Sequence, residues 1–181
     1  MGLGMRHRGF SIVLLYLLAL PVTSWASNQG AGRVRMQGSI IDTPCAIDVD
    51  SRDQSVDMSV LPFGQIMHDG RGPSRPFSIR LVNCVLAHDN PNRPDWSTFR
   101  VTFDGPSSDG SLFALSGQGR GIGVLIADDA GNTALPGKQM PPGNLHADNM
   151  MLNYTIRLVA DRKPLRAGEY RATIRFKLDY Y

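Results

Sequence analysis

The chain has 181 residues, of which 42% are hydrophobic and 19% charged, and its formal net charge is +3. This length suits a single domain, and so small a net charge excludes the strongly basic surface that is typical of nucleic-acid-binding proteins. Its longest basic run is only "DRKPLR" (161–166), which we interpret as a solvated turn. We therefore expect no nucleic-acid partner.

The N-terminus has the pattern of a secretory signal peptide, which we predict to be residues 1–26. A short basic stretch precedes the apolar run 10–22, and small residues occupy the positions that a signal peptidase reads. The apolar run is too short to span a bilayer, which needs about 20 residues. We expect cleavage between Ala26 and Ser27. Cleavage removes 2 of the 19 Lys and Arg, so the mature chain is nearly neutral, with 17 basic against 16 acidic residues.

Residues 27–41 form an N-terminal arm that contains an alternating stretch. Val34, Met36, Gly38 and Ile40 would share one face of an extended strand. Glycine is disfavoured inside strands because it has no side chain to pack and loses the most backbone entropy on ordering. Gly38 on the apolar face therefore indicates a bulge or a close approach to another backbone.

Two cysteines, Cys45 and Cys84, follow the arm. An even count in an exported chain indicates one disulfide, which would stabilise the fold by about 4 kcal/mol in the chain-entropy model. A metal site has no support, because no second Cys or His lies at ligand spacing from either cysteine.

Period-two alternation of apolar and polar residues dominates the rest of the chain. Turn signals rich in Gly, Pro and Asp separate the alternating segments, and no window shows a sustained helical period with caps. This pattern predicts an all-β, antiparallel sandwich in one domain, residues 42–181. The predicted strands are 55–60, 77–84, 98–105, 121–128, 151–160 and 169–181.

No segment carries a catalytic motif. His68, His88 and His146 lie in polar, turn-like segments, and we expect them to be solvated. Ser116 lacks the flanking pattern of a nucleophile elbow, and the "DDAGN" stretch (128–132) is typical of a turn. The sequence therefore predicts no enzyme, no metal and no cofactor.

Four motifs together resemble the pilins of the bacterial chaperone–usher pathway. The first is "GRVRMQGSIIDTPC" (32–45), in which Met36 replaces the usual aromatic residue. The second and third are "FSIRLVNC" (77–84) and "GIGVLIADDAGN" (121–132), and the last is "GEYRATIRFKLDYY" (168–181). These motifs occur in the family's order and cover nearly the whole mature chain.

The resemblance implies an incomplete immunoglobulin-like β-sandwich that lacks its last strand and carries an N-terminal donor-strand extension. It also implies three kinds of partner: a periplasmic chaperone, an outer-membrane usher and neighbouring pilus subunits. The chain would pass through the periplasm into a cell-surface fimbrium. Its last strand would face the groove left by the missing strand and would contact the chaperone. The residues expected there are Gly168, Tyr170, Ile174, Phe176, Leu178, Tyr180 and Tyr181.

Within the family, the second half of the chain is most similar to the terminating, anchoring minor subunit of P-type pili. That subunit carries a longer N-terminal extension, whereas only residues 27–33 precede the alternating arm here. The expected function is that of a structural, minor pilus subunit that polymerises by donor-strand exchange and supports cell adhesion. Two alternatives are a small periplasmic enzyme on a sandwich scaffold and a self-contained, secreted immunoglobulin-like module that binds carbohydrate or protein.

Overall fold

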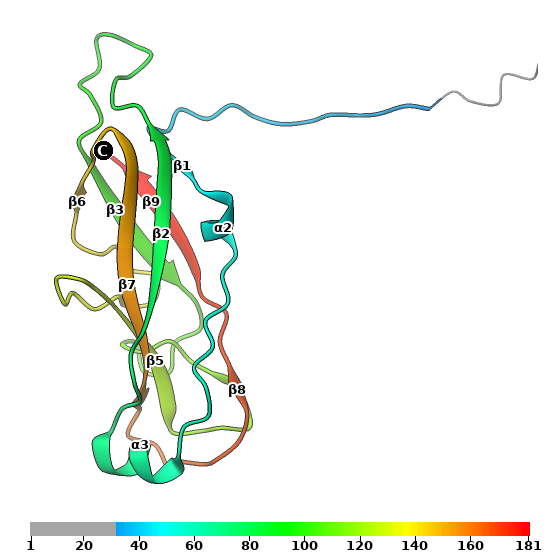
Figure 1. Cartoon of the computed structure of the whole chain (residues 1–181), viewed down its shortest axis with the longest axis vertical. Helices are drawn as coiled ribbons and strands as arrows, with labels where there is room; N and C mark the ends of the chain where they lie inside the picture. Colours follow the sequence, from blue (N-terminus) through cyan, green and yellow to red (C-terminus); the bar gives the residue numbers. More distant parts are fainter. Residues whose placement is uncertain (1–31) are drawn as a thin grey trace, which may run out of the picture. The chain divides into compact units, whose positions relative to one another are not determined.

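The computed structural model describes residues 32–181, and the chain divides into two units, Met1–Ile40 and Ile41–Tyr181. All helices and strands of the described residues belong to the second unit (Figure 1). None of these helices is long and apolar enough to cross a membrane. The predicted signal peptide and its cleavage site between Ala26 and Ser27 lie outside the described residues.

The larger sheet has four antiparallel strands in the order β1-β2-β7-β5. They are β1 (Ala46–Ile47), β2 (Arg75–Cys84), β7 (Asp148–Ala160) and β5 (Ile122–Asp128). The central strand β7 pairs with β2 along one edge and with β5 along the other. The two ladders overlap over residues 154–156, where β7 has a strand partner on both edges.

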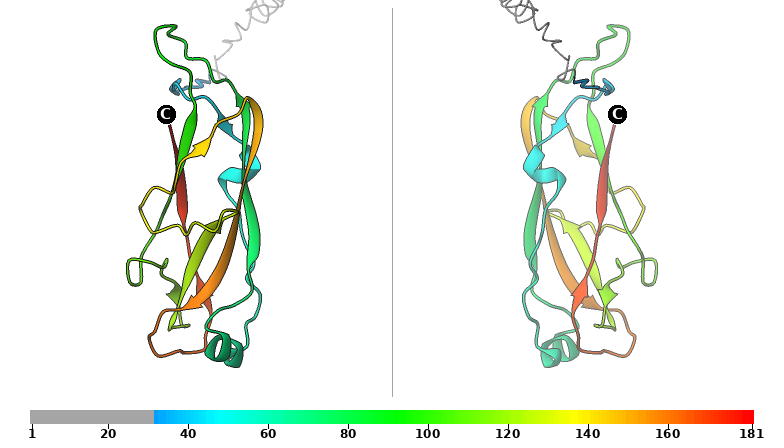
Figure 2. Two further views of the ribbon diagram at one scale, coloured as in Figure 1. Left: turned by 90° about the vertical axis from the view of Figure 1, so that its left-hand side faces the viewer. Right: turned by 90° about the vertical axis from the view of Figure 1, so that its right-hand side faces the viewer.

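A second sheet packs against the first and has the order β6-β3-β9 (Figure 2). Its strands are β6 (Gly143–Asn144), β3 (Thr98–Asp104) and β9 (Arg175–Tyr180), and a separate pair joins β4 (Ser116–Gly117) to β8 (Tyr170–Arg171). Because β9 is an edge strand, only one of its two backbone edges has a strand partner among the described residues. The expected all-β sandwich is confirmed.

The core lies between the two sheets and follows the period-two pattern of the sequence. Ile79 and Leu81 of β2 are completely buried, as is Phe113. Phe77, Phe103 and Tyr154 form an aromatic cluster, with ring centroids 5.0 to 6.1 Å apart. Such aromatic contacts add to the apolar area that the two sheets bury against each other.

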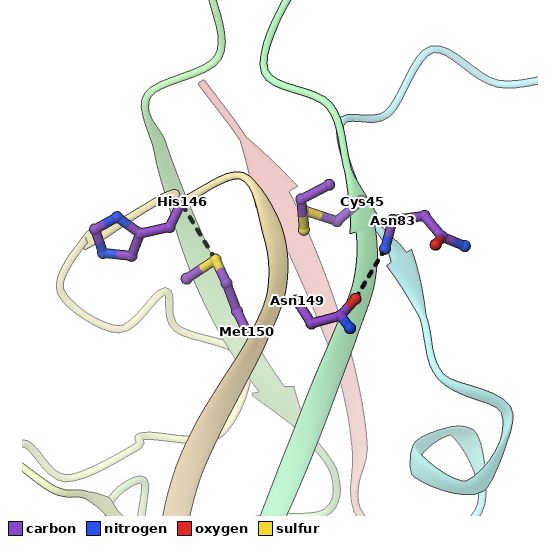
Figure 3. Close-up of a disulfide and its surroundings, with 6 residues drawn as sticks. Cys45, Asn83, His146, Asn149 and Met150 are labelled. Carbon is purple, nitrogen blue, oxygen red and sulfur yellow. Dashed lines mark hydrogen bonds between the residues drawn. A yellow bond between two sulfur atoms is a disulfide. The ribbon is translucent and has the colours of Figure 1, made fainter.

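The predicted disulfide joins Cys45 to Cys84 (Figure 3). It connects the residue before β1 to the last residue of β2. A backbone hydrogen bond from Val85 to the Pro44 carbonyl lies beside it. The Asn83 amide donates to the Asn149 side chain, which ties the same end of β2 to β7.

Four of the six predicted strands of the domain are confirmed, and two are wrong in part or entirely. Residues 55–60 form no strand, although they alternate as cleanly as the others. Residues 169–181 form two strands, β8 and β9, with residues 172–174 unpaired between them. Both deviations occur where no neighbouring strand of the described residues supplies hydrogen bonds, so alternation alone does not fix a strand there.

Two short helices were not expected from the sequence. They are α2 (Val49–Arg52) and α3 (Phe63–Asp69), and Gly70 ends α3 in the left-handed conformation with its amide donating to the Ile66 carbonyl. Only Ile66 of α3 is buried, so the helix carries no apolar stripe long enough to show in a window of sequence.

The expectation that all three histidines are solvated is wrong for His88. Its side chain is only 4% exposed, and its ring packs on Trp96 at a centroid distance of 4.1 Å. Its Nδ1 atom lies 3.5 Å from the Asp42 carboxylate. His68 and His146 are exposed, as expected. Trp96 lies eight residues after His88 in the sequence. The residues directly after His88 are polar, so a short window around it does not reveal the aromatic contact.

Candidate functional site: an apolar groove between two unpaired walls

A groove of about 1450 Å³ runs along one edge of the sandwich. The first wall is residues 53–61, which connect α2 to α3, and the second wall is residues 165–176, which include β8 and the start of β9. Figure 1 shows these two segments running along the same edge of the domain.

The floor of the groove is apolar because it is the inner face of both sheets. Its side chains alternate along β2, β3, β5 and β7, so the groove opens directly into the hydrophobic core. Eight apolar residues line it: Phe77, Phe103, Leu115, Ile122, Val124, Ile126, Ile156 and Leu158. An apolar groove that opens to the solvent along a sheet edge indicates a binding surface.

The backbones of both walls lack strand partners across the groove. The first wall contains no strand, and the second wall pairs only outward, through β8 with β4 and through β9 with β3. No backbone hydrogen bond joins residues 53–61 to residues 165–176. Unpaired amides and carbonyls on the two sides of an apolar floor are the features that an added β-strand would satisfy.

The first wall is held by side-chain contacts around Ser59. The Ser59 amide donates to the Asp57 carboxylate at 2.7 Å, and Arg75 donates to the Ser59 hydroxyl at 2.9 Å. Ser59 has a φ of +59°, which is uncommon for a residue with a side chain. This left-handed residue interrupts the extended backbone, which explains why residues 55–60 are not a continuous strand.

The second wall places Tyr170, Ile174 and Phe176 along the groove. The Tyr170 hydroxyl crosses the groove and donates to the Ser59 carbonyl at 3.3 Å. Burial raises the pKa of Tyr170 above its ordinary value, and the Asp57 carboxylate raises it further. The hydroxyl is therefore protonated, and able to donate, throughout the physiological pH range.

Glycines allow the second wall to approach the loop before β5. A Cβ on Gly117 would collide with the Glu169 carbonyl, and a Cβ on Gly168 would lie 2.7 Å from the Gln118 side chain. Gly117 also has a φ of +114°, which favours glycine. Gly168, expected to belong to the last strand, instead lies just before β8 at this crossing and lines the groove.

The remaining residues of the expected last strand lie farther along β9. Leu178 and Tyr180 do not line the groove, and Tyr180 packs edge-on against Trp96 at 6.4 Å between ring centroids. Tyr181 is exposed, and its carbonyl accepts from the Ser97 and Thr98 amides. Four of the seven expected residues therefore line the groove, namely Gly168, Tyr170, Ile174 and Phe176. The other three, Leu178, Tyr180 and Tyr181, lie outside it.

The described part of the arm, residues 32–41, contains no strand. Val34 and Met36 are 90% and 94% exposed, and Ile40 is fully exposed. Nothing lies within 4 Å of the position that a Cβ on Gly38 would take. The arm therefore alternates in sequence but forms no strand, because no strand of the described residues pairs with it.

The described residues contain no group of three or more His, Cys, Asp or Glu that could hold a metal ion. Sequence reasoning missed the first wall as part of the site, and it missed the contact from Tyr170 to Ser59. The only available signal was the alternation at 55–60, which predicts an apolar surface but does not reveal what that surface faces.

Comparison with known proteins identifies the family. The sequence profile described as "Fimbrial protein" matches residues 34–181. The chain is 38% identical over 150 residues to the PRS fimbrial minor pilin protein of Escherichia coli, an alignment that covers 82% of this chain and 77% of that one. It is 32% identical over 175 residues to the Fimbria A protein of Serratia marcescens, with 93% and 97% of the two chains covered.

A solved structure shares the fold. The rod subunit PapA of the P pilus superposes with a TM-score of 0.70 at 24% identity, over 77% of this chain and all of that one. These relatives are fimbrial proteins, which confirms that the chain is a pilus protein related to minor pilins and not an enzyme. The chain therefore belongs to the fimbrial protein family.

Proposed function

We propose that the groove receives a β-strand donated by another protein chain, and that this strand completes the sandwich. The observation that carries the proposal is the pair of unpaired backbone walls on the two sides of an apolar floor. A strand placed between them would gain backbone hydrogen bonds from the walls, and alternate side chains would pack on the floor. Without it, the apolar floor and the free strand edge would favour aggregation.

The donor within a pilus would be the arm, residues 27–41, of a neighbouring subunit. Its apolar residues Val34, Met36 and Ile40 alternate with polar ones and are exposed, so they are free to pack in a groove. Gly38 would lie where the receiving groove has no room for a side chain. Assembly would then proceed by exchange of one donated strand for another.

Before assembly, a periplasmic chaperone would fill the groove and pair with the second wall and β9. The free edge of β9 supports this role for the last strand. An outer-membrane usher would then exchange the chaperone strand for the arm of the next subunit at the cell surface. The similarity to a minor pilin favours a specialised position in the pilus, such as termination or anchoring, and a part in cell adhesion.

Co-expression with the cognate chaperone tests the proposal. We expect a soluble one-to-one complex, and we expect a synthetic peptide of residues 27–41 from a pilus subunit to displace the chaperone from an internal subunit. Refusal of the peptide, together with normal insertion of this chain's own arm elsewhere, would assign the terminating position. A stable monomer that needs no chaperone would contradict the proposal and favour a self-contained binding module.

The arm is tested separately by Gly38→Arg. Because the predicted partner of Gly38 belongs to another subunit, we expect the variant to bind the chaperone normally and to fail to enter a neighbouring groove. Gly32→Arg is the matched control, since Gly32 also has nothing within 4 Å but lies outside the alternating stretch. Loss of chaperone binding by Gly38→Arg would place Gly38 in this chain's own fold.

A further inference from the structure

A single side-chain hydrogen bond joins the two walls of the groove among the described residues. The Tyr170 hydroxyl donates to the Ser59 carbonyl at 3.3 Å, across 111 residues of sequence. Both residues line the groove, so this bond crosses the space between the walls.

The acceptor side of the bond is fixed in place. The Asp57 carboxylate accepts from the Ser59 amide, and Arg75 from β2 donates to the Ser59 hydroxyl. A non-glycine residue at a φ of +59° persists only when its surroundings hold it there. The Ser59 carbonyl therefore has a defined direction rather than that of a loose loop.

The donor side is fixed as well. Tyr170 pairs with Gly117 in the β4–β8 ladder, and its side chain packs against the hydrophobic core. The close crossing of Gly117 with Glu169 leaves this part of the second wall little freedom to shift. The tyrosine is thus held with its hydroxyl directed across the groove.

We infer that Tyr170 and Ser59 form a latch across the groove, which a donated strand must open before it can pair with both walls. The inference rests on the proposed function. An incoming strand needs the space between the walls, and in the latched state the Tyr170 side chain crosses that space. The latch also occupies the Ser59 carbonyl, a backbone acceptor of the first wall. Opening it precedes pairing, so the latch slows strand entry.

The test measures how fast a donated strand enters the groove. The denatured subunit is diluted into refolding buffer so that it folds with an empty groove, a synthetic peptide of residues 27–41 of this chain is added at once, and formation of the subunit–peptide complex is followed by native mass spectrometry. Tyr170→Phe removes the hydrogen bond and keeps the ring. We expect it to accelerate peptide binding on the order of threefold to tenfold, the range that one hydrogen bond of ordinary strength gives.

Two further variants make the result specific. Ser59→Ala removes the contact with Arg75 and loosens the acceptor, so it should accelerate peptide binding by a smaller factor than Tyr170→Phe. Tyr154→Phe is the matched control, because Tyr154 is a buried tyrosine of β7 that does not line the groove. It should bind the peptide at the same rate as the natural chain.

The outcomes separate the latch from the proposed function. Equal rates of peptide binding by the natural chain and Tyr170→Phe would overturn the latch and leave the strand-receiving groove intact. If the natural chain binds the chaperone but refuses the peptide, peptide binding by Tyr170→Phe supports the latch. Refusal of the peptide by both chains would overturn the latch as the barrier. Failure of the natural chain and of every variant to bind the chaperone would overturn the proposed function.

Discussion

Two sides of the sandwich differ, although their sequences follow the same pattern. On the closed side, where β2, β7 and β5 lie, β7 pairs with β2 over residues 148–156 and with β5 over residues 154–160, and the alternating residues of all three strands face the core. On the open side, the two walls of the groove also alternate, yet residues 55–60 form no strand and residues 172–174 are unpaired. Val60, in phase with Val56 and Met58, is 95% exposed.

This difference shows what an alternating sequence reports. Alternation indicates that one face of a segment packs against apolar partners, but it does not indicate whether those partners belong to the same chain. The closed side finds them within the chain, so its segments are strands. The walls and the arm do not find them among the described residues, which is the reason for proposing that another chain supplies them.

Amide hydrogen exchange gives the most direct test of this contrast and the largest expected effect. In the subunit freshly refolded from denaturant at low concentration, pulse-labelled before it can aggregate, amides of the first wall should exchange on the order of a thousandfold faster than those of β7, because the latter open only with the core. Addition of a donor-strand peptide should slow the wall amides and leave β7 unchanged. Equal protection of the two regions before addition would show that the open side is already complete.

Removal of the disulfide tests how much the link between the start of the domain and the end of β2, on the closed side, stabilises the fold. Cys45→Ala combined with Cys84→Ala should lower the free energy of unfolding by about 4 kcal/mol, because the unfolded chain loses its longest constraint. Urea unfolding of the strand-bound subunit measures this change. Reduction of the natural chain should reproduce it and should not affect the variant. A loss below about 1 kcal/mol would contradict the expectation.

Gly117→Ala tests the close crossing that supports the second wall. The added Cβ would collide with the Glu169 carbonyl at a left-handed position, so we expect a loss of about 3 kcal/mol in unfolding free energy. Gly131→Ala is the matched control, because Gly131 has a similar backbone conformation and open space around it. It should cost only about 1 kcal/mol. Equal losses of unfolding free energy in the two variants would mean that backbone strain, and not the collision with Glu169, determines the cost.

The smallest expected effect concerns charge on β9, the edge strand of the open side. The Lys177 ammonium and the Gln139 amide lower the pKa of Asp179 below its ordinary value. A carboxylate with a lowered pKa in the folded state stabilises the fold above its unfolded pKa, and this contribution is lost as the pH falls through the folded value. Asp179→Asn should therefore reduce the fall in urea midpoint between about pH 6 and about pH 3. An equal fall in urea midpoint for the variant and the natural chain would contradict a stabilising role of the Asp179 carboxylate.

Much of the closed side could be predicted from the sequence. The segments expected at 77–84, 98–105, 121–128 and 151–160 are strands whose ends differ from the expected bounds by at most three residues, and Cys45 pairs with Cys84. These features depend on local alternation and on the only two cysteines, so they need no knowledge of long-range packing. The burial of His88 under Trp96 was not predictable, because a side chain elsewhere in the loop creates its environment.

The sequence by itself determined an all-β sandwich with one disulfide and membership of the fimbrial family, because the period-two pattern and the family motifs are local properties of the chain. Only the tertiary structure decided which alternating segments pair, where the groove lies and that Tyr170 reaches Ser59 across it. Residues 111 positions apart meet there because the two walls approach along one edge. Such an approach depends on how both sheets pack, and no window of sequence contains that information.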